Sequence, residues 1–234
     1  MRIHKFLAQA GICSRREAER LVSEGLVTIN GKVAGTGQPV DPAVDVVRYR
    51  GREVKSVSRN VVLMMNKPRG FLCTNVDSHG GHTVFEMVPP EYKTLRLFCV
   101  GRLDKDSEGL LLLTNDGALA NKVMHPSGGV LKRYEVHLNR DYDPKLTPKL
   151  LKGAMEEGEL LRFKKVIRSP DDPKQLEVHL DQGRKREIRR LFEIFGFHVK
   201  VLKRFQIGSL VLRKMPLGDC RPLSRKEIDL IFEN

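Results

Sequence analysis

Short runs of apolar residues, each bounded by glycine, proline or polar residues, recur along this chain. Three of them are Val61–Met65, Leu95–Val100 and Leu110–Leu113. Short apolar runs between turn residues are typical of buried β-strands. We therefore predict strands at these three places, with polar loops between them.

A second kind of strand is predicted where apolar and polar residues alternate. Lys132–Leu138 alternates in this way, so that Tyr134 and every second residue after it share one face. Leu160–Ile167 and Gln175–Leu180 are β-prone and are joined by a Ser-Pro-Asp-Asp-Pro turn, which predicts two further strands. The middle of the chain is therefore expected to be rich in strands.

Helical patterns occur in fewer places. Ser14 and Glu17 have the spacing of a capping box, which predicts a helix from about Arg15 to Glu24. Apolar residues at helical spacing, followed by Gly196, predict a second helix near the C-terminal end. This second stripe consists of Ile188, Leu191, Phe192 and Phe195. Shorter helices are predicted in segments 3–7, 116–123, 144–158 and 225–231.

The first fifty residues have their own pattern of helix, helix and hairpin. The dipeptide of Asn30 and Gly31 between two short β-prone runs predicts a tight hairpin. Residues 48–60 are polar and basic and lack a helical period, so they predict a connection between domains, with room for a final strand of the small domain inside it. We thus predict a small domain at 1–50, a linker at 51–60 and a larger domain at 61–234.

Charge is distributed unevenly along the chain of 234 residues, which has 40% apolar residues and a formal net charge of +13. The apolar content supports a packed core, and no stretch approaches the length of a membrane-spanning helix. Between Arg184 and Arg204, eight lysines and arginines face two glutamates, a surplus of six that is nearly half of the net charge. A basic surface can serve solubility, but this clustering favours a surface that follows nucleic-acid phosphates.

Neither the cysteines nor the histidines form a recognisable metal site. The four cysteines are scattered and contain no CxxC pair, which fits a reducing cytosol and argues against a disulfide framework and a zinc knuckle. They are Cys13, Cys73, Cys99 and Cys220. No acidic or cysteine partner follows His79 and His82 at ligand spacing, so a glycine-rich loop near RNA is favoured over a metal site. The N-terminal segment lacks the apolar run of a secretory signal, and we expect a cytoplasmic protein.

A carboxylate in the middle of the chain is the main candidate for chemistry. Asp104 lies in a polar, glycine-bounded turn between two predicted strands, which would hold the loop rigidly. Asp106 lies two residues further along the same loop. Aspartate is also favoured in turns for purely structural reasons, so these residues alone leave both interpretations open.

Segment 100–117, which reads VGRLDKDSEGLLLLTNDG, resembles the signature of the pseudouridine synthases that carry a GRLD loop. Three further segments resemble elements of that family: NKPRG at 66–70, a Lys-x-Tyr element at 132–134 and GRKREIRR at 183–190. The resemblance implies an α+β fold in which helices flank a mixed, largely antiparallel catalytic sheet. It also implies an enzyme that isomerises uridine to pseudouridine in RNA, with no metal or other cofactor.

The same resemblance implies roles for individual residues. Asp104 corresponds to the catalytic nucleophile, Tyr134 to the tyrosine that packs on the extruded base, and Arg189 to the arginine that pairs with the nucleophile. A positive charge beside Asp104 would keep its carboxylate ionised. Arg102 would reach toward the space that the flipped base leaves. Contacts with RNA are expected from Arg102, Lys132, Arg186 and Arg190.

Residues 3–34, which read IHKFLAQAGICSRREAERLVSEGLVTINGKVA, resemble the small RNA-binding domain named after the fourth ribosomal protein of the small subunit. The resemblance implies that a set of basic residues faces RNA phosphates. This set consists of Arg15, Arg16, Arg20 and Lys32. Contacts of this kind give affinity and register with little choice of sequence.

One position departs from the common pattern of the family. Glu187 stands where glutamine is more usual, and glutamate occurs in the branch that modifies large-subunit ribosomal RNA. We therefore expect ribosomal RNA, or a ribosomal precursor particle, as the partner of a monomeric enzyme. Small-subunit ribosomal RNA and tRNA remain alternative substrates. A catalytically inactive RNA-binding assembly factor is a further alternative, and the joint presence of Asp104, Tyr134 and Arg189 favours the enzyme.

Overall fold

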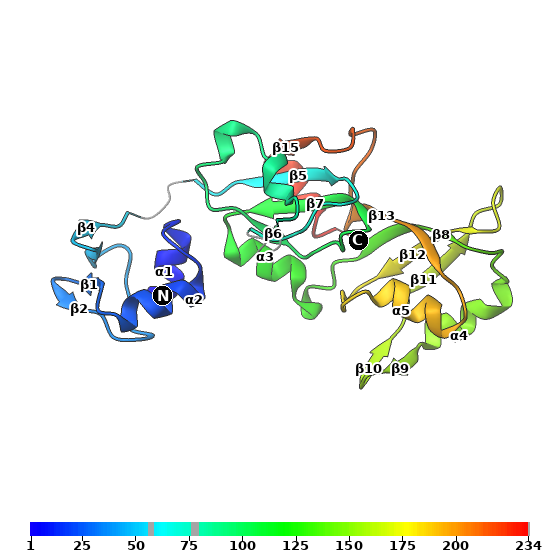
Figure 1. The fold of residues 1–234 in the computed structure, drawn as a ribbon, viewed down its shortest axis with the longest axis horizontal. Coiled ribbons are helices and arrows are strands. Elements are labelled where there is room, and N and C mark those ends of the chain that lie inside the picture. The colour runs from blue at the N-terminus through cyan, green and yellow to red at the C-terminus, as the bar shows by residue number, and fades with distance from the viewer. Residues whose placement is uncertain (56–58, 76–79, 234) are drawn as a thin grey trace. The chain divides into compact units, whose positions relative to one another are not determined.

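The computed structural model describes residues 1–55, 59–75 and 80–233 of the chain. The chain packs as two compact units (Figure 1). The first comprises Met1–Val61 with the short segments Thr94–Leu97 and Asn115–Gly117, and the second comprises the remainder. Within the described ranges, no helix is both long enough and apolar enough to cross a membrane.

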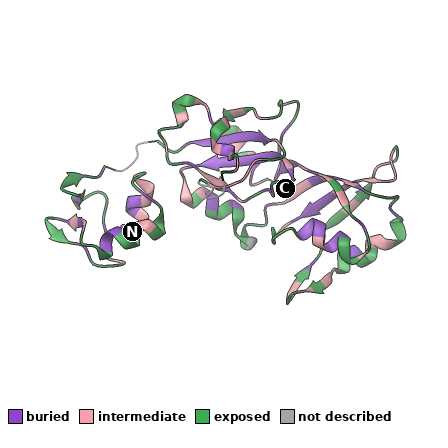
Figure 2. Cartoon of the chain, viewed as in Figure 1, coloured by how far each residue is buried: buried purple, intermediate pink, exposed green. Residues whose placement is uncertain are grey.

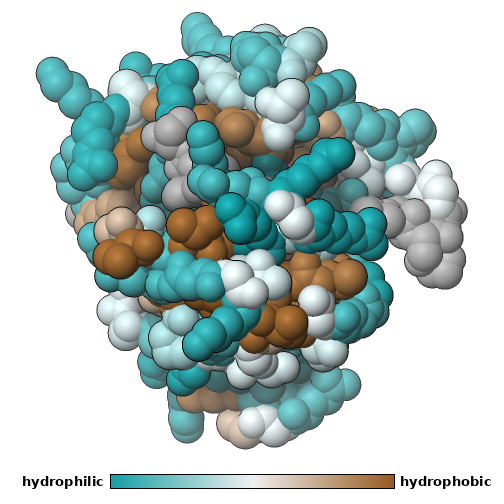
Figure 3. Space-filling view, turned by 90° about the vertical axis from the view of Figure 1, so that its left-hand side faces the viewer, coloured by the Kyte–Doolittle hydropathy of each residue, from teal (hydrophilic) through white to brown (hydrophobic). Residues whose placement is uncertain are grey.

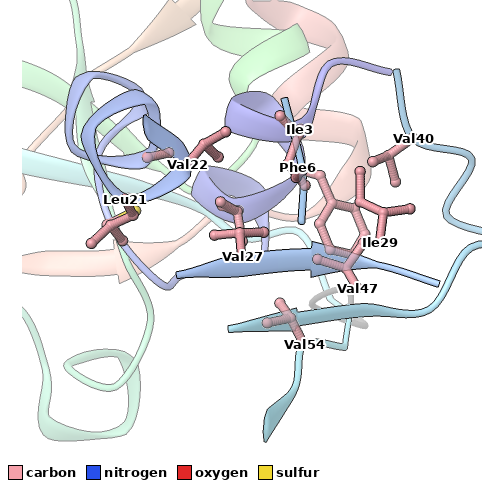
Figure 4. Close-up of a cluster of buried hydrophobic side chains, with 13 residues drawn as sticks. Ile3, Phe6, Leu21, Val22, Val27, Ile29, Val40, Val47 and Val54 are labelled. Atoms are coloured by element: carbon pink, nitrogen blue, oxygen red, sulfur yellow. The ribbon is translucent and has the colours of Figure 1, made fainter. Parts of the chain in front are cut away.

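The first unit packs two helices against a small antiparallel sheet of strand order β2-β1-β3-β4. Its elements are α1 (Ile3–Gln9), α2 (Arg15–Ser23), β1 (Val27–Ile29), β2 (Lys32–Val33), β3 (Val47–Tyr49) and β4 (Arg52–Glu53). Apolar side chains from both helices and from the strands form one core (Figure 4). This unit therefore has a hydrophobic core of its own.

Local sequence signals explain how this unit is built. The Ser14 hydroxyl accepts a hydrogen bond from the backbone N–H of Glu17 at 3.1 Å, so α2 begins where predicted. The Glu17 carboxylate pairs with Arg20 one turn further along. Asn30 and Gly31 have φ values of +52° and +82°, the left-handed values that a tight hairpin turn requires, and the predicted hairpin is confirmed.

The sheet of the first unit extends beyond that hairpin. β3 and β4 pair within residues 47–53, so part of the segment predicted as a linker is strand. Residues 56–58 of that segment lie outside the described residues.

Hydrophilic side chains cover most of the face drawn in Figure 3, with smaller apolar patches between them.

The second unit is built on one mixed sheet of nine strands. The strand order is β11-β12-β8-β13-β7-β5-β15, with β14 paired to β13 and β6 paired to β7. The strands are β5 (Val62–Lys67), β6 (Phe98–Val100), β7 (Glu108–Thr114), β8 (Lys132–Leu138), β11 (Lys165–Arg168), β12 (Gln175–Leu180), β13 (Val199–Ile207), β14 (Leu210–Val211) and β15 (Cys220–Pro222). Among the described pairs of these nine strands, only β13 with β7 is parallel, which confirms the predicted α+β fold with a largely antiparallel sheet.

Short helices and a hairpin complete the second unit. They are η1 (Val84–Met87), η2 (Pro90–Tyr92), α3 (Gly117–Met124), η3 (Pro126–Gly128), η4 (Pro144–Leu146), α4 (Thr147–Lys152), β9 (Ala154–Glu156), β10 (Glu159–Leu161), α5 (Glu187–Ile194) and α6 (Arg225–Leu230). β5 is buried throughout and β7 is buried except at its first residue (Figure 2). Burial on both faces explains why these two strands read as continuous apolar runs.

The parallel pairing of β7 with β13 depends on one glycine. Gly109 lies opposite Arg204, and a Cβ on Gly109 would lie 2.2 Å from the carbonyl oxygen of Arg204. Gly109 also has a φ of +105°, which side-chain-bearing residues rarely adopt. Only glycine fits where the two strands meet. The parallel pairing of β7 with β13 places the loop that precedes β7, which carries Asp104, next to β13.

The structure corrects two strand expectations and adds one strand that was not expected. Leu160–Ile167 is divided between β10 and β11, because the chain turns between them to bury Phe163, whose ring centroid lies 5.2 Å from that of Phe192 in α5. The run Leu95–Val100 is strand only at Phe98–Val100. β13 was not predicted at all, since lysine, arginine and glutamine interrupt its apolar pattern.

The C-terminal helix α6 begins with the predicted capping box. Ser224 accepts from the backbone N–H of Glu227, and the Glu227 carboxylate accepts from the backbone N–H of Ser224 at 2.9 Å and from Arg221 at 2.7 Å. The Arg221 hydrogen bond, followed by the backbone bond, lowers the pKa of Glu227 from 4.5 to about 2. The charged form of Glu227 is therefore stabilised in the folded state.

We expect Glu227→Gln to lower the melting temperature of the second unit by about 3 °C at neutral pH, because a lost cap costs about 1 kcal/mol. A folded-state pKa below the unfolded value means that this stabilisation is present above pH 4.5 and lost as the pH falls toward 2. Calorimetry across this pH range measures the effect. The exposed Glu233→Gln serves as the charge-matched control, and an equal shift in both variants would contradict the assignment.

Candidate active site

A cavity of about 440 Å³ lies in the second unit, where the loop 101–107, the start of α5 and one face of the sheet meet. Arg102 and Asp104 line it from the loop, and Arg184 and Arg186 line it from the segment before α5. We call its sheet side the floor, which consists of Lys132, Tyr134, Leu180, Leu202 and Arg204. The cavity thus brings Asp104 and Tyr134 together with three of the expected RNA contacts.

Lys67 holds the loop that carries Asp104. Its side chain is fully buried, and its ammonium donates to the carbonyl oxygens of Pro68 (3.0 Å), Asp104 (3.2 Å) and Ser107 (2.8 Å). Burial lowers the pKa of Lys67, and neighbouring acidic groups that include Asp104 oppose this shift. The sequence interpretation assigned no role to Lys67, although the NKPRG segment contains it.

Arg189 was expected to pair with Asp104, and in this structure its guanidinium binds backbone carbonyl groups. The side chain is 7% exposed and donates to the carbonyl oxygens of Val199 (2.7 Å) and Asp106 (3.3 Å). Arg69 donates to the same Asp106 carbonyl at 3.1 Å. Among the described residues, Arg189 makes no ion pair with Asp104. Arg189 instead ties the backbone of the loop to β13, because both of its bonds go to carbonyl groups.

Arg186 provides the positive charge that faces Asp104. Its guanidinium lies 3.7 Å from an Asp104 carboxylate oxygen, and the two side chains are 40% and 33% exposed. Arg186 occupies the N-cap of α5 with a φ of +52°, in the left-handed region that is costly for a residue with a side chain. Such strain is often found at functional sites, and here it directs the chain into α5 beside Asp104.

Glu187 fixes the segment that precedes α5. It is 3% exposed, and its carboxylate accepts from the Gln182 side chain at 2.7 Å and from the backbone N–H of Arg184 at 3.0 Å. Burial raises the pKa of Glu187, and these hydrogen bonds oppose the shift. The two oxygens of a carboxylate can accept both bonds. A glutamine at this position would instead point its NH₂ group at one of the two N–H donors.

Arg190 was expected to contact RNA, and in this structure its guanidinium is paired with carboxylates of the protein. Its side chain is 15% exposed and pairs with Glu156 and with Glu159 (2.9 Å), which lie in the hairpin of β9 and β10. These ion pairs link the hairpin to α5, and Figure 1 shows the two elements near each other. Arg102, by contrast, is exposed, and Lys132 is half-buried.

The basic residues of the first unit also differ in availability. Arg15, Arg16 and Lys32 are exposed. Arg20 is exposed too, but it pairs with Glu17 and Glu24 on the same helix. Arg20 is therefore a weaker candidate for a phosphate contact than the sequence suggested.

The described residues give no sign of a metal centre. His82 lies 2.9 Å from a Glu86 carboxylate oxygen, and His79 lies outside the described residues. No group of three or more histidine, cysteine, aspartate or glutamate side chains suited to a metal ion occurs in residues 1–55, 59–75 and 80–233.

Comparison with known proteins identifies the family. The family model described as RNA pseudouridylate synthase matches residues 61–193, which include the loop, the floor strands β8 and β12 and the start of α5. The chain belongs to the RNA pseudouridylate synthase family. It is accordingly an isomerase that acts on RNA. A second family model, of the S4 domain, matches residues 1–46.

Relatives of this synthase match along its full length. The ribosomal large subunit pseudouridine synthase B of Vibrio cholerae is 38% identical over 239 residues, which cover 99% of this chain and 74% of the relative. An uncharacterized RNA pseudouridine synthase of Aquifex aeolicus is 37% identical over 100% of this chain and 94% of the relative. A crystal structure of a pseudouridylate synthase superposes with a TM-score of 0.71 at 26% identity and covers 99% of both chains.

Proposed function

We propose that this synthase converts a uridine of large-subunit ribosomal RNA to pseudouridine, with Asp104 as the nucleophile. The observation that carries the proposal is the cavity itself, in which the Asp104 carboxylate faces Arg186 at 3.7 Å beside a floor that contains Tyr134. The name of the Vibrio cholerae relative and the glutamate at position 187 favour large-subunit RNA.

In the proposed reaction the bond from the sugar C1′ to the uracil ring is transferred from N1 to C5. The target uridine is first extruded from the RNA, because its reacting atoms are covered in a stack or a pair. A carboxylate oxygen of Asp104 bonds to C1′ as the bond from C1′ to N1 breaks, and the electron pair stays on the ring. The ring turns, and its C5 displaces the carboxylate from C1′. The proton on C5 then leaves, and N1 takes one up, so the product is an isomer of the substrate.

Residues around Asp104 support this chemistry. Arg186 places a positive charge 3.7 Å from the Asp104 carboxylate, and Lys67 and Arg189 hold the loop by its carbonyl groups. Tyr134 is 7% exposed and offers its ring to the extruded base. Arg102 is exposed at the edge of the cavity and is proposed to enter the space that the base leaves.

RNA pseudouridine mapping tests the substrate. Ribosomal RNA from cells without this protein should lack one pseudouridine of the large subunit, and the wild-type gene should restore it. A missing site in small-subunit RNA or tRNA would move the proposal to that substrate. An unchanged map would favour an RNA-binding assembly factor without activity.

We further propose that residues 1–50 form an RNA-binding domain joined by 51–60 to a catalytic domain at 61–234. The S4 match at 1–46 and the separate core of the first unit support this division. The proposed partner is ribosomal RNA or a precursor particle, which a monomeric enzyme meets in the cytoplasm.

Neutralising Arg15, Arg16 and Lys32 together with glutamine should weaken RNA binding and leave turnover at saturating RNA unchanged. Each phosphate contact contributes about 0.7–0.9 to the slope of log affinity against log salt, so the triple variant should lose a slope of about 2. Filter binding at several salt concentrations measures this. Arg20→Gln is the control, because Arg20 is already ion-paired. An unchanged slope in the triple variant would show that these residues do not contact RNA.

A further inference from the structure

Two buried polar groups without a hydrogen-bond partner line the cavity. Arg204 is 3% exposed and donates from Nε to the Leu110 carbonyl oxygen at 2.7 Å, but its Nη2 has no partner among the described residues. The hydroxyl of Ser107, which is 1% exposed, likewise lacks a partner within the described ranges. Unpaired buried donors are rare in folded proteins, and a cavity beside them suggests that a ligand completes them.

Strand register places Arg204 on the same face of the sheet as the proposed base-packing residue. Arg204 of β13 lies opposite Tyr134 of β8, and residues directly opposite in an antiparallel pair point to the same side. Lys132 lies two residues before Tyr134 and therefore shares this face. The floor thus presents an aromatic ring flanked by two cations.

Lys132 is the second cation on this face of the sheet. No salt bridge joins it to a carboxylate among the described residues, and it is half-buried in the floor. Burial, followed by the charge of Arg204, lowers the pKa of Lys132, while Asp181 and Glu187 oppose the shift. Two cations that repel one another at the base of a cavity favour a ligand with negative charge.

We infer that Arg204 and Lys132 receive the ring oxygens of the target uracil and stabilise the negative charge that the ring acquires when it leaves C1′. The inference rests on the proposed function and adds a leaving-group site to it. When the bond from C1′ to N1 breaks, its electron pair stays with the uracil, and the charge spreads over N1, O2 and O4. Donors aimed at developing charge in a site without water are among the strongest catalytic devices.

The surroundings favour the base over a phosphate as the partner of Arg204. Leu180 and Leu202 border the two cations on the floor, and an apolar border suits the faces of a planar ring. Arg204 is reached only by a group that enters the cavity, because it is almost fully buried. Arg102 and Arg186 are more exposed and are better placed for the RNA backbone.

Single-turnover kinetics with Arg204→Gln and two substrates test this inference. With uridine-containing RNA, the rate of loss of the parent nucleoside should fall about 100-fold, as for the removal of one donor to developing charge. With RNA that carries 5-fluorouridine at the target, the same rate should fall only about tenfold. Fluorine already stabilises the negative charge on the departing ring, so the donor contributes less to that stabilisation. RNA affinity should change little.

Other variants separate the alternatives. Lys132→Gln should show the same substrate dependence, and it carries the test if Arg204→Gln fails to fold. The exposed Lys214→Gln is the charge control and should lose no rate. Cys73→Ser should also retain its rate. A hydrogen bond with Cys99 is the main cause that lowers the pKa of the Cys73 thiol to about 6, and the charge of Arg204 contributes to this shift. Cys73→Ser therefore tests whether Arg204 acts through the thiol.

Three results would overturn the inference. If Arg204→Gln loses the same factor in rate on uridine-containing and 5-fluorouridine-containing RNA, Arg204 does not act on the leaving ring. If Arg204→Gln binds RNA more weakly and with a smaller salt slope, Arg204 is a phosphate contact. If Cys73→Ser loses as much rate as Arg204→Gln, Arg204 acts through the Cys73 thiol. An inactive wild-type protein would defeat the proposed function itself, whereas full activity in Arg204→Gln defeats only this inference.

Discussion

Asp104→Asn is expected to abolish pseudouridine formation while RNA binding survives. Asparagine keeps the size and much of the hydrogen-bonding shape of aspartate, but it lacks the charge and the nucleophilic oxygen. The loop should keep its course, because Lys67 binds the carbonyl oxygen of residue 104 and not its side chain. Loss of a covalent nucleophile typically costs about 10⁴–10⁶ in rate. Base-specific chemical labelling of the RNA measures the product, since substrate and product have the same mass.

Asp106→Asn is the matched control in the same loop. The Asp106 backbone carbonyl accepts from Arg69 and Arg189, whereas its exposed side chain forms no hydrogen bond or ion pair with the described residues. We expect this variant to keep substantial activity. Normal activity in Asp104→Asn would contradict the mechanism, and inactivity confined to Asp106→Asn would move the nucleophile to Asp106.

Arg189→Ala should lower the single-turnover rate at saturating RNA by about 10³, because the loop that carries Asp104 loses a charged support. The Val199 carbonyl oxygen would lose its bond from Arg189, and the Asp106 carbonyl would keep only the bond from Arg69. A buried polar group left unpaired costs about 1–3 kcal/mol. Urea unfolding should therefore show a lower free energy of unfolding, while RNA affinity changes little.

Arg190→Ala, at the next position, is the control for Arg189→Ala. Its guanidinium pairs with Glu156 and Glu159 of the β9–β10 hairpin, away from the Asp104 loop. We expect a small loss of rate and a change confined to the hairpin. If Arg189→Ala weakens RNA binding but turns over normally at saturation, Arg189 is a phosphate contact and not a support of the loop.

Elements whose sequence signals are local were predictable. β8 and β12 have the predicted bounds, and α2 and α6 begin at the predicted caps. β13 was missed because Arg204 and Gln206 are polar, although both are buried in the sheet. A polar residue at an inward position hides a strand from pattern analysis, and in β13 one such residue, Arg204, lines the cavity of the candidate site.

The candidate site was predictable only as far as its motifs extend. The segment 100–117 pointed to Asp104 and the Lys-x-Tyr element to Tyr134, and both line the same cavity. The charge opposite Asp104 was assigned to Arg189, but Arg186 provides it. Helical spacing could not show this, because Arg186 precedes the first turn of α5 in a left-handed conformation.

Counting basic residues also overstated the surface available to RNA. Within the charge cluster at 184–204, Arg189 and Arg204 are buried and donate to backbone carbonyl groups. Arg190 is neutralised by the glutamates of the β9–β10 hairpin. These three guanidinium groups are therefore withdrawn from RNA phosphates, and the partners that reveal this are distant in the sequence.

Release of the C5 hydrogen tests the central claim most directly, because C5 must lose its hydrogen once it is bonded to C1′. Large-subunit ribosomal RNA labelled with tritium at uridine C5 would be incubated with the purified protein, and the tritium released to water would be counted. The wild-type enzyme should release tritium up to the stoichiometry of a single site, and Asp104→Asn should release none. No release by the wild-type enzyme, or equal release by Asp104→Asn, would contradict the account.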